Sequence, residues 1–172
     1  NTGRSSAADL VALLIDTGFR LSEAIRMEWR QADVDPQTGD VEWVRILKDN
    51  KADYPRSVPT TARVKALLKA RREARPEGER RVFHDLTVDA AQWAWECVRT
   101  NQKMTDDPEF VLHCCRHTFA SRLAMSGATL PEIKELGGWK TLAMVMRYAH
   151  LCPDSKANAI KRMEARSALK VG

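Results

Sequence analysis

The stretch LHCCRHTFASRL, residues 112–123, sets two basic side chains into a segment that otherwise has the composition of a buried helix. His113 and Arg116 are three residues apart, so on a helix they lie on the same face. The Leu, Cys, Phe and Ala residues around them are types that usually face a protein core. The two side chains therefore either satisfy each other inside the core or hold an anion at the edge of the domain.

Apolar periodicity and turn signals on both sides of this stretch predict a mostly α-helical domain with a small three-stranded antiparallel sheet. The sheet is expected from ADV (32–34), VEWVRIL (41–47) and RSVP (56–59), with turn chemistry in DPQTGD between the first two. Ser22 is expected to cap the second helix. The predicted helices cover residues 5–18, 22–29, 61–74, 87–100, 113–127, 130–138, 141–151 and 153–169.

Length and composition limit the class of protein. A chain of 172 residues is long enough for one domain with its own core, and we expect residues 1–172 to form that single domain. No run of about 18 apolar residues occurs, which excludes a predicted membrane span. The first residues lack the layout of a signal peptide, and the abrupt start suggests a piece of a longer protein. Four cysteines without a paired framework favour reduced thiols and a cytoplasmic location.

The net charge of +5 is moderate, but part of it is concentrated. Residues 63–81 carry eight Lys or Arg against three Glu. Such a cluster raises the probability of a polyanionic partner, although composition alone favours a solvated helix face.

Two further segments offer anion-binding groups. In TGFRLSE (17–23), Arg20 stands just before a helix begins, where the helix dipole is already positive. An arginine is useful there if an anion binds both the guanidinium group and the amides; otherwise it is an exposed arginine or one paired with Glu23. Lys48 and Lys51 lie in the loop between two predicted strands, where a lysine can reach a phosphate or simply solubilise the turn.

The histidine-rich stretch also permits a different interpretation. His113 and His117 are four residues apart, with Cys114 and Cys115 between them, which could suggest zinc. The cysteines, however, would point to other faces of the helix, and no second ligand pair follows at finger spacing. No metal is therefore predicted. Near the C-terminus, Tyr148 taken alone is most simply a core residue.

The order of these features resembles the catalytic domain of the tyrosine recombinases, the phage integrase family. The resemblance runs from Thr17 to His150 and rests on TGxRxSE, a hairpin lysine, HxxR followed by HTFAS, LGGW and RYAHL. It implies the fold of that catalytic domain, and with it DNA integration or another site-specific recombination. It also implies an N-terminal DNA-clamping domain in full-length relatives, outside this chain.

The resemblance assigns a role to each matching residue. The two arginines would clamp the scissile phosphate of double-stranded DNA, and the tyrosine would attack it to give a 3′-phosphotyrosine intermediate. The hairpin lysine would be the general acid; Lys51 keeps the family spacing to RSVP, and Lys48 is the alternative. His113 would be the base that takes the tyrosine proton, or its relay, whereas His117 and His150 would be structural. The site residues implied are Arg20, Lys51, His113, Arg116, Trp139 and Tyr148, supported by Glu23.

One position departs from the family pattern. Trp139 stands where the family most often has histidine, and an indole N–H can donate a hydrogen bond but cannot shuttle a proton. Hydrogen bonding and packing are therefore the roles expected of it. The resemblance further implies a reaction without metal or cofactor. It implies other protomers of the same protein as partners, with a tetramer in the synaptic complex, and a phage or bacterial cytoplasm as the location.

Three competing interpretations stay open at this point. A type IB topoisomerase shares the same catalytic logic, and supercoil relaxation without strand exchange would identify it. A DNA-binding module that has lost catalysis would shift DNA in a gel but form no covalent adduct. A metal-binding domain would contain metal after purification. The target sequence and the biological task, whether integration, excision or chromosome resolution, are not encoded in any pattern seen here.

Overall fold

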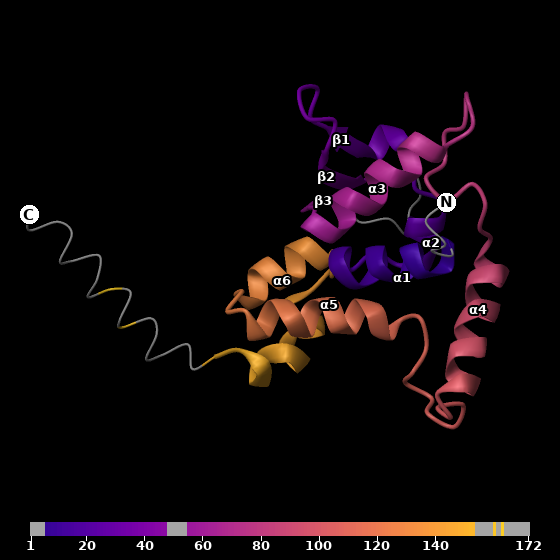
Figure 1. Ribbon diagram of the computed structural model, residues 1–172. Helices are drawn as coiled ribbons and strands as arrows, with labels where there is room; N and C mark the ends of the chain where they lie inside the picture. Colours follow the sequence, from indigo (N-terminus) through magenta and orange to yellow (C-terminus); the bar gives the residue numbers. More distant parts are fainter. Residues whose placement is uncertain (1–5, 48–54, 154–159, 161–162, 164–172) are drawn as a thin grey trace, which may run out of the picture.

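The computed structural model describes residues 6–47 and 55–153, together with Ile160 and Met163. It confirms a mostly helical domain with one three-stranded antiparallel sheet (Figure 1). The α-helices are α1 (Ser6–Thr17), α2 (Leu21–Ile25), α3 (Ala62–Ala74), α4 (Val88–Asn101), α5 (Cys114–Met125) and α6 (Leu130–Gly137). Three short 3₁₀ helices are η1 (Trp29–Gln31), η2 (Leu142–Met144) and η3 (Met146–Leu151).

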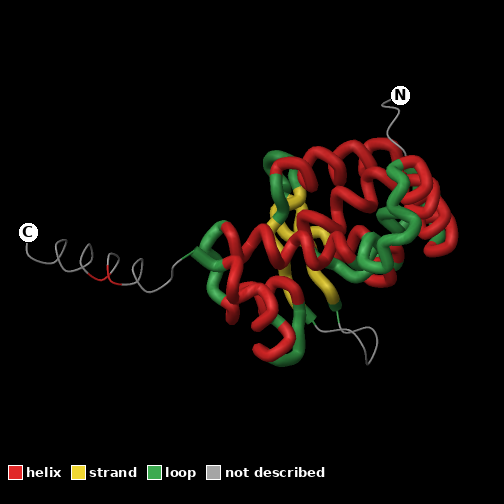
Figure 2. Tube along the Cα trace, turned by 90° about the horizontal axis from the view of Figure 1, so that it is seen from below, coloured by secondary structure: helices red, strands yellow, loops and turns green. Residues whose placement is uncertain are grey.

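The sheet has the order β1-β2-β3, with each strand antiparallel to the next. Its strands are β1 (Ala32–Val34), β2 (Val41–Ile46) and β3 (Arg56–Pro59), as the sequence predicts. On β3 the alternation of a strand places Arg56 and Val58 on the buried face. Helix α3 packs on β2 and α6 packs on β3. Figure 2 shows the strands with helices beside them.

Helix α5 joins two buried clusters of side chains. It lies beside α1, and Phe119 and Cys115 reach from it into the main cluster, which α1, the sheet and α3 complete. Its other side packs against α6 and η3. There a second, smaller cluster contains Ala120, Ala124, Ile133, Trp139, Val145 and Tyr148. The HxxR stretch therefore lies at the junction of the two clusters.

Three local expectations are wrong. The helix predicted over 22–29 is shorter, because α2 ends at Ile25 and residues 29–31 form η1. Ser22 does not cap α2; the N-cap residue is Arg20, because the Glu23 carboxylate accepts the Arg20 backbone N–H at 2.7 Å. Residues 141–151 form η2 and η3 rather than one α-helix. Val145 and Tyr148 are the buried side chains of this segment, and their spacing of three residues matches the three residues per turn of a 3₁₀ helix.

Two predictions lie largely beyond the part of the chain that the structure describes. The loop with Lys48 and Lys51 falls in the gap between residues 47 and 55, and the predicted helix over 153–169 lies almost wholly outside the described ranges. Within those ranges, no helix combines the length and the apolar character that crossing a bilayer requires.

Candidate active site

The turn after α1 brings the first arginine of the candidate site next to α5. Gly18 has a φ of +64°, a left-handed conformation that glycine adopts without steric cost. A Cβ atom at this position would lie 2.3 Å from the Phe119 ring of α5. The Gly18 carbonyl also accepts a hydrogen bond from Nη1 of Arg116. The turn that carries Arg20 and the helix that carries Arg116 are thereby fixed against each other.

Glu23 lies between two arginines. Its Oε1 accepts a hydrogen bond from Arg20 Nη1 at 2.8 Å, and its Oε2 accepts one from Arg56 Nη2 at 2.7 Å. Burial alone would raise the pKa of this carboxyl group. The hydrogen bonds and charges of Arg56 and Arg20 outweigh burial, so the pKa of Glu23 lies below its ordinary value. Glu23 is therefore an anion that orients both guanidinium groups, the supporting role that the resemblance implies.

Arg56 is a member of the site that the sequence did not single out. Its side chain is 1% exposed, and a second contact joins Nη1 to Glu23 Oε1 at 3.2 Å. The guanidinium carbon lies 5.2 Å from the centre of the Phe19 ring. The only signal in the sequence was its place on the buried face of a short strand, where an arginine needs a partner. The sequence could not name that partner, 33 residues away.

Arg116 is buried and only partly satisfied. It is 2% exposed, and its guanidinium carbon stands 4.2 Å from the centre of the Trp139 ring, a cation–π arrangement. Among the described residues, its buried Nη2 atom has no hydrogen-bond partner. Burial, together with the charges of Arg20 and Arg56, lowers the pKa of Arg116 to about 10, so the group remains positive at neutral pH. A buried cation with an unused donor is a site for an anion.

Trp139 follows α6 in a tight arrangement that depends on two glycines. Gly138 has a φ of +69° and ends α6, and a Cβ there would lie 2.8 Å from Cδ of Arg56. The Trp139 ring folds back onto Gly137, whose hypothetical Cβ would overlap the ring at 1.8 Å. The LGGW motif thus lets the Trp139 ring lie against the guanidinium group of Arg116, while Arg56 packs on the backbone of Gly138. The packing role expected of Trp139 agrees with this geometry.

The structure supports a prediction about Gly138. Gly138→Ala is expected to cost about 1–2 kcal/mol for the left-handed backbone alone, and more because the new methyl group displaces Arg56. Gly127→Ala is the matched control, since Gly127 has a φ of +91° and nothing lies within 4 Å of its hypothetical Cβ. Urea unfolding of both variants would measure the difference. Equal losses of stability would contradict a role for the contact with Arg56.

Tyr148 and the two histidines form the other side of the site. Tyr148 lies on η3, is 4% exposed, and has its phenol oxygen 2.6 Å from Nδ1 of His117. Burial raises the pKa of Tyr148, although the charges of Arg147 and Arg116 act in the opposite direction. The ring centres of Tyr148 and Trp139 are 6.0 Å apart. At neutral pH the phenol therefore carries its proton.

His113 is the N-cap residue of α5 and is exposed. Its ring meets that of His117 edge-to-face, with centres 5.0 Å apart. Burial of the ring nitrogens, His117 and the charges of Arg116 and Arg20 lower the pKa of His113. The charge of Arg20 acts on both His113 and Arg116, and that of Arg116 acts on His113, so these groups share one site. The structure thus brings together Arg20, Glu23, His113, Arg116, Trp139 and Tyr148, whereas Lys51 and Lys48 lie outside the described residues.

The cysteines beside the two histidines are not exposed thiols. Cys115 is buried, and burial raises its pKa to about 12. Burial also raises the pKa of Cys114. Within the described ranges, no three His, Cys, Asp or Glu side chains are grouped as metal ligands would be.

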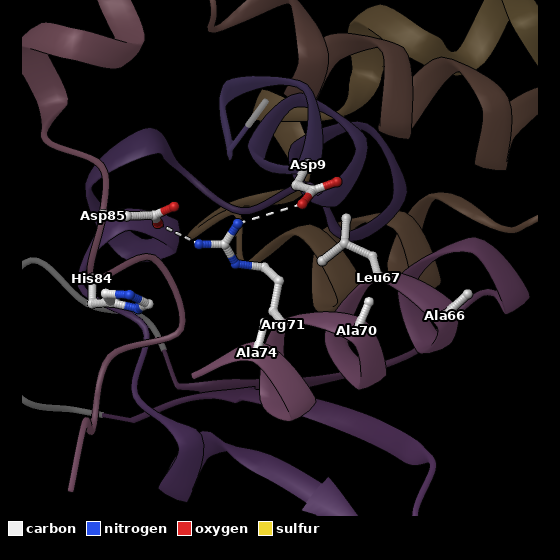
Figure 3. A pocket seen from close by; sticks show the side chains of 8 residues that line it. All are labelled: Asp9, Ala66, Leu67, Ala70, Arg71, Ala74, His84 and Asp85. Atoms are coloured by element: carbon white, nitrogen blue, oxygen red, sulfur yellow. Dashed lines mark hydrogen bonds and ion pairs between the residues drawn. The ribbon is translucent and has the colours of Figure 1, made fainter. Parts of the chain in front are cut away.

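Within the described part of the chain, half of the eight basic residues in segment 63–81 form ion pairs, namely Arg63, Lys65, Lys69 and Arg71. Arg63 pairs with Asp16 at 2.6 Å, and Lys65 pairs with Glu42. Arg71 lines the pocket of Figure 3, where it extends from α3 toward Asp9, 3.4 Å away, and toward Asp85. These acids neutralise much of the cluster, so its surplus of charge is weaker than the sequence suggests. The guanidinium groups around Glu23 are the better candidates for holding a phosphate.

Comparison with known protein families adds independent evidence. The sequence profile described as the phage integrase family matches residues 4–154. The integrase of Salmonella phage P22 is 27% identical over 170 residues, which cover 91% of this chain and 42% of that protein. Tyrosine recombinase XerD of Corynebacterium glutamicum is 30% identical over 154 residues, covering 85% of this chain and 48% of that protein. The chain thus spans less than half the length of these relatives.

Solved structures agree with the fold. The catalytic domain of bacteriophage HP1 integrase superposes with a TM-score of 0.67 at 28% identity, covering 90% of this chain and 80% of that one. The XerH site-specific recombinase in its post-cleavage complex gives a TM-score of 0.67 at 21% identity, with 92% and 46% of the two chains covered. The fold implied by the resemblance is therefore confirmed.

Proposed function

Because this chain belongs to the phage integrase family, we propose that it is the catalytic unit of a site-specific recombinase that cuts and rejoins double-stranded DNA through Tyr148. The observation that carries the proposal is the crowding of Arg20, Arg56 and Arg116 around one carboxylate, beside a buried phenol. Three cations with one anion leave an excess of positive charge. A phosphodiester supplies the missing negative charge, and the unpartnered Nη2 of Arg116 supplies a donor for it.

The proposed reaction uses these groups as follows. Arg20 and Arg116 hold the non-bridging oxygens of the scissile phosphate and offset the charge that builds up as a nucleophile approaches. The Tyr148 oxygen forms a bond to phosphorus while the bond to the 5′ oxygen breaks. The product is a 3′-phosphotyrosine and a free 5′ hydroxyl group. The ester conserves the bond energy, so a 5′ hydroxyl from another strand can reverse the attack.

The leaving 5′ oxygen needs a proton, and we assign this to a lysine of the hairpin. Lys51 is the first choice, because its spacing to RSVP matches the family, and Lys48 is the second. A lysine near several arginines has a lowered pKa and can act as an acid near neutrality. The same proposal includes a tetramer of this protein in the synaptic complex. It also includes a cytoplasmic location.

The direct test is covalent trapping of the 172-residue chain on nicked duplexes of randomised sequence. A nick just 3′ of the cut releases the short leaving strand, so the adduct cannot be religated, and the random bases remove the need to know the target. Trypsin separates the two tyrosines, because Arg147 precedes Tyr148 and Arg56 closes the peptide of Tyr54. Mass spectrometry should find the nucleotide on the peptide that starts at Tyr148. An adduct elsewhere, or none, contradicts the proposal.

Weak, salt-sensitive binding to DNA is expected of this chain on its own. Contacts to the phosphate backbone of DNA alone give dissociation constants of about 10⁻⁴–10⁻⁶ M at physiological salt. The affinity falls steeply as the salt concentration rises. The domain that clamps DNA in longer relatives is proposed to provide the missing affinity. Gel shifts or fluorescence anisotropy between low and high salt would measure this. Tight binding that salt does not affect would contradict it.

A further inference from the structure

The hydrogen bond between His117 and Tyr148 has no place in the mechanism proposed so far. His117 follows Arg116 directly on α5, and its Nδ1 atom lies 2.6 Å from the phenol oxygen. Among the described residues, His117 is the side chain hydrogen-bonded to that oxygen, whereas His113 meets only the ring of His117. A nucleophile and a base within hydrogen-bond reach is the arrangement by which enzymes activate hydroxyl groups.

The charges around the pair determine the direction of this hydrogen bond. Burial and the charges of Arg147 and Arg116 lower the pKa of His117, while Glu109 opposes them. The imidazole ring is therefore neutral at pH 7. Since the pKa of Tyr148 is raised, its phenol is protonated and donates. In the tautomer with the ring proton on Nε2, Nδ1 of His117 accepts this hydrogen bond, and the proposal below takes that tautomer.

We infer that His117 is the catalytic base that takes the phenol proton of Tyr148 during DNA cleavage. The O–H bond of Tyr148 breaks and its proton moves to Nδ1 of His117, as the oxygen bonds to phosphorus. The 5′ oxygen leaves and takes its proton from the hairpin lysine. In rejoining, the phenolate leaves and recovers the proton from His117. This inference rests on the proposed function.

The same charges explain why the pair is inactive without DNA. A protonated His117 beside Arg116 and Arg147 is unfavourable, so the free protein holds the proton on the phenol. A bound phosphate brings negative charge to the same place and makes the imidazolium form less costly. Binding of the phosphate and activation of Tyr148 are thus coupled, because the charge of the phosphate makes protonation of His117 easier. Under this assignment His113 is left to donate to the phosphate.

The test measures single-turnover cleavage of a nicked duplex selected from the random pool, between pH 5 and pH 9. His117→Asn retains an oxygen that can accept from the phenol but cannot take its proton. Its rate at pH 7 is expected to fall about 10²–10⁴-fold, the usual contribution of a general base. The deficit should shrink by about tenfold per pH unit as the solution removes the proton instead. The control is His150→Asn. His150 is exposed on η3, the 3₁₀ helix that carries Tyr148, and this variant should cleave at the wild-type rate.

The pH profile of the wild type follows from the sign of the shift. Because the pKa of His117 is lowered, its neutral form persists below the ordinary value of 6.5. With DNA well below saturation, where the rate reports the pKa values of the free protein, wild-type cleavage should therefore be level through neutral pH and decline only in acid. His117→Ala, with and without added imidazole, provides a second variant, and imidazole should restore part of its rate. These profiles separate a base from a residue that merely supports packing.

A substrate with sulfur in place of the bridging 5′ oxygen distinguishes base from acid. Thiolate leaves without protonation, so this substrate rescues a lost acid but not a lost base. His117→Asn should stay slow on it. Rescue by sulfur, a wild-type pH profile of the variant, or no response of the alanine variant to imidazole would each overturn the inference while Tyr148 remained the nucleophile. A wild-type protein without a Tyr148 adduct would instead overturn the proposed function.

Discussion

Tyr148→Phe is expected to abolish the covalent DNA adduct, with a loss in cleavage rate on the order of 10⁶-fold, the scale on which removal of an enzyme's nucleophile acts. The substitution removes one oxygen atom and leaves the ring in the cluster with Trp139 and Val145. The lost hydrogen bond to His117 should cost only about 0.5–1.5 kcal/mol of stability. The variant therefore remains folded, and the loss is chemical.

The matched control for this variant is Tyr54→Phe, because the chain has two tyrosines. It should retain full adduct formation on the same nicked duplexes. Denaturing gels would measure both variants, and thermal unfolding would verify that both are folded. An adduct that persists in the Tyr148 variant, or disappears in the Tyr54 variant, would show that the nucleophile is misassigned.

Arg56→Met is expected to destabilise the domain by about 3–5 kcal/mol, because it leaves the buried Glu23 carboxylate without its main partner. For a domain of this size that corresponds to a fall in Tm of about 6–20 °C. Arg20 stays in contact with Glu23 at 2.8 Å and offsets part of the cost. Calorimetry or urea unfolding of the purified protein would measure the loss.

Two variants test the cause of this loss. Arg45→Met breaks a pair with Asp33 in the same sheet, in which both side chains are 47% exposed, and it should cost at most about 1 kcal/mol. The double variant Arg56→Met, Glu23→Leu removes both buried charges and should recover much of the stability. If the double variant is no more stable than Arg56→Met alone, the uncompensated carboxylate is not the cause.

Local sequence patterns predicted most of the elements because their signals lie within a few residues of each other. The strands 32–34, 41–46 and 56–59 follow from alternation and from the turn DPQTGD. Thr61, Thr87 and Thr129 cap α3, α4 and α6 through their side chains, which the sequence signals directly. These features need no knowledge of the tertiary structure.

The errors arose where distant parts of the chain decide the local structure. Apolar spacing in 141–151 suits a helix, yet Leu142, Met144 and Met146 are exposed, and the segment instead follows the three-residue spacing of its buried side chains. From the sequence, Arg56 is only one more basic residue, because its partner Glu23 lies 33 residues away on α2. The contact between His117 and Tyr148, 31 positions later, could not be foreseen either, because nothing local in the sequence signals it.

The site could be predicted from the order of its motifs, but its electrostatics could not. The resemblance named Arg20, His113 and Arg116, and the structure brings them together. That Arg116 keeps an unused donor, and that a third arginine shares Glu23, depend on burial and on contacts between elements. Only the fold supplies these.

The position of Tyr148 inside the small cluster has a consequence for stray damage to DNA. The ring packs with Ile133, Val145 and Trp139, and only 4% of the residue is exposed. A DNA backbone that merely brushes the surface of the domain therefore meets little of the phenol. Cleavage is expected only where a phosphate enters the cluster of arginines beside it, so the packing of the nucleophile protects passing DNA.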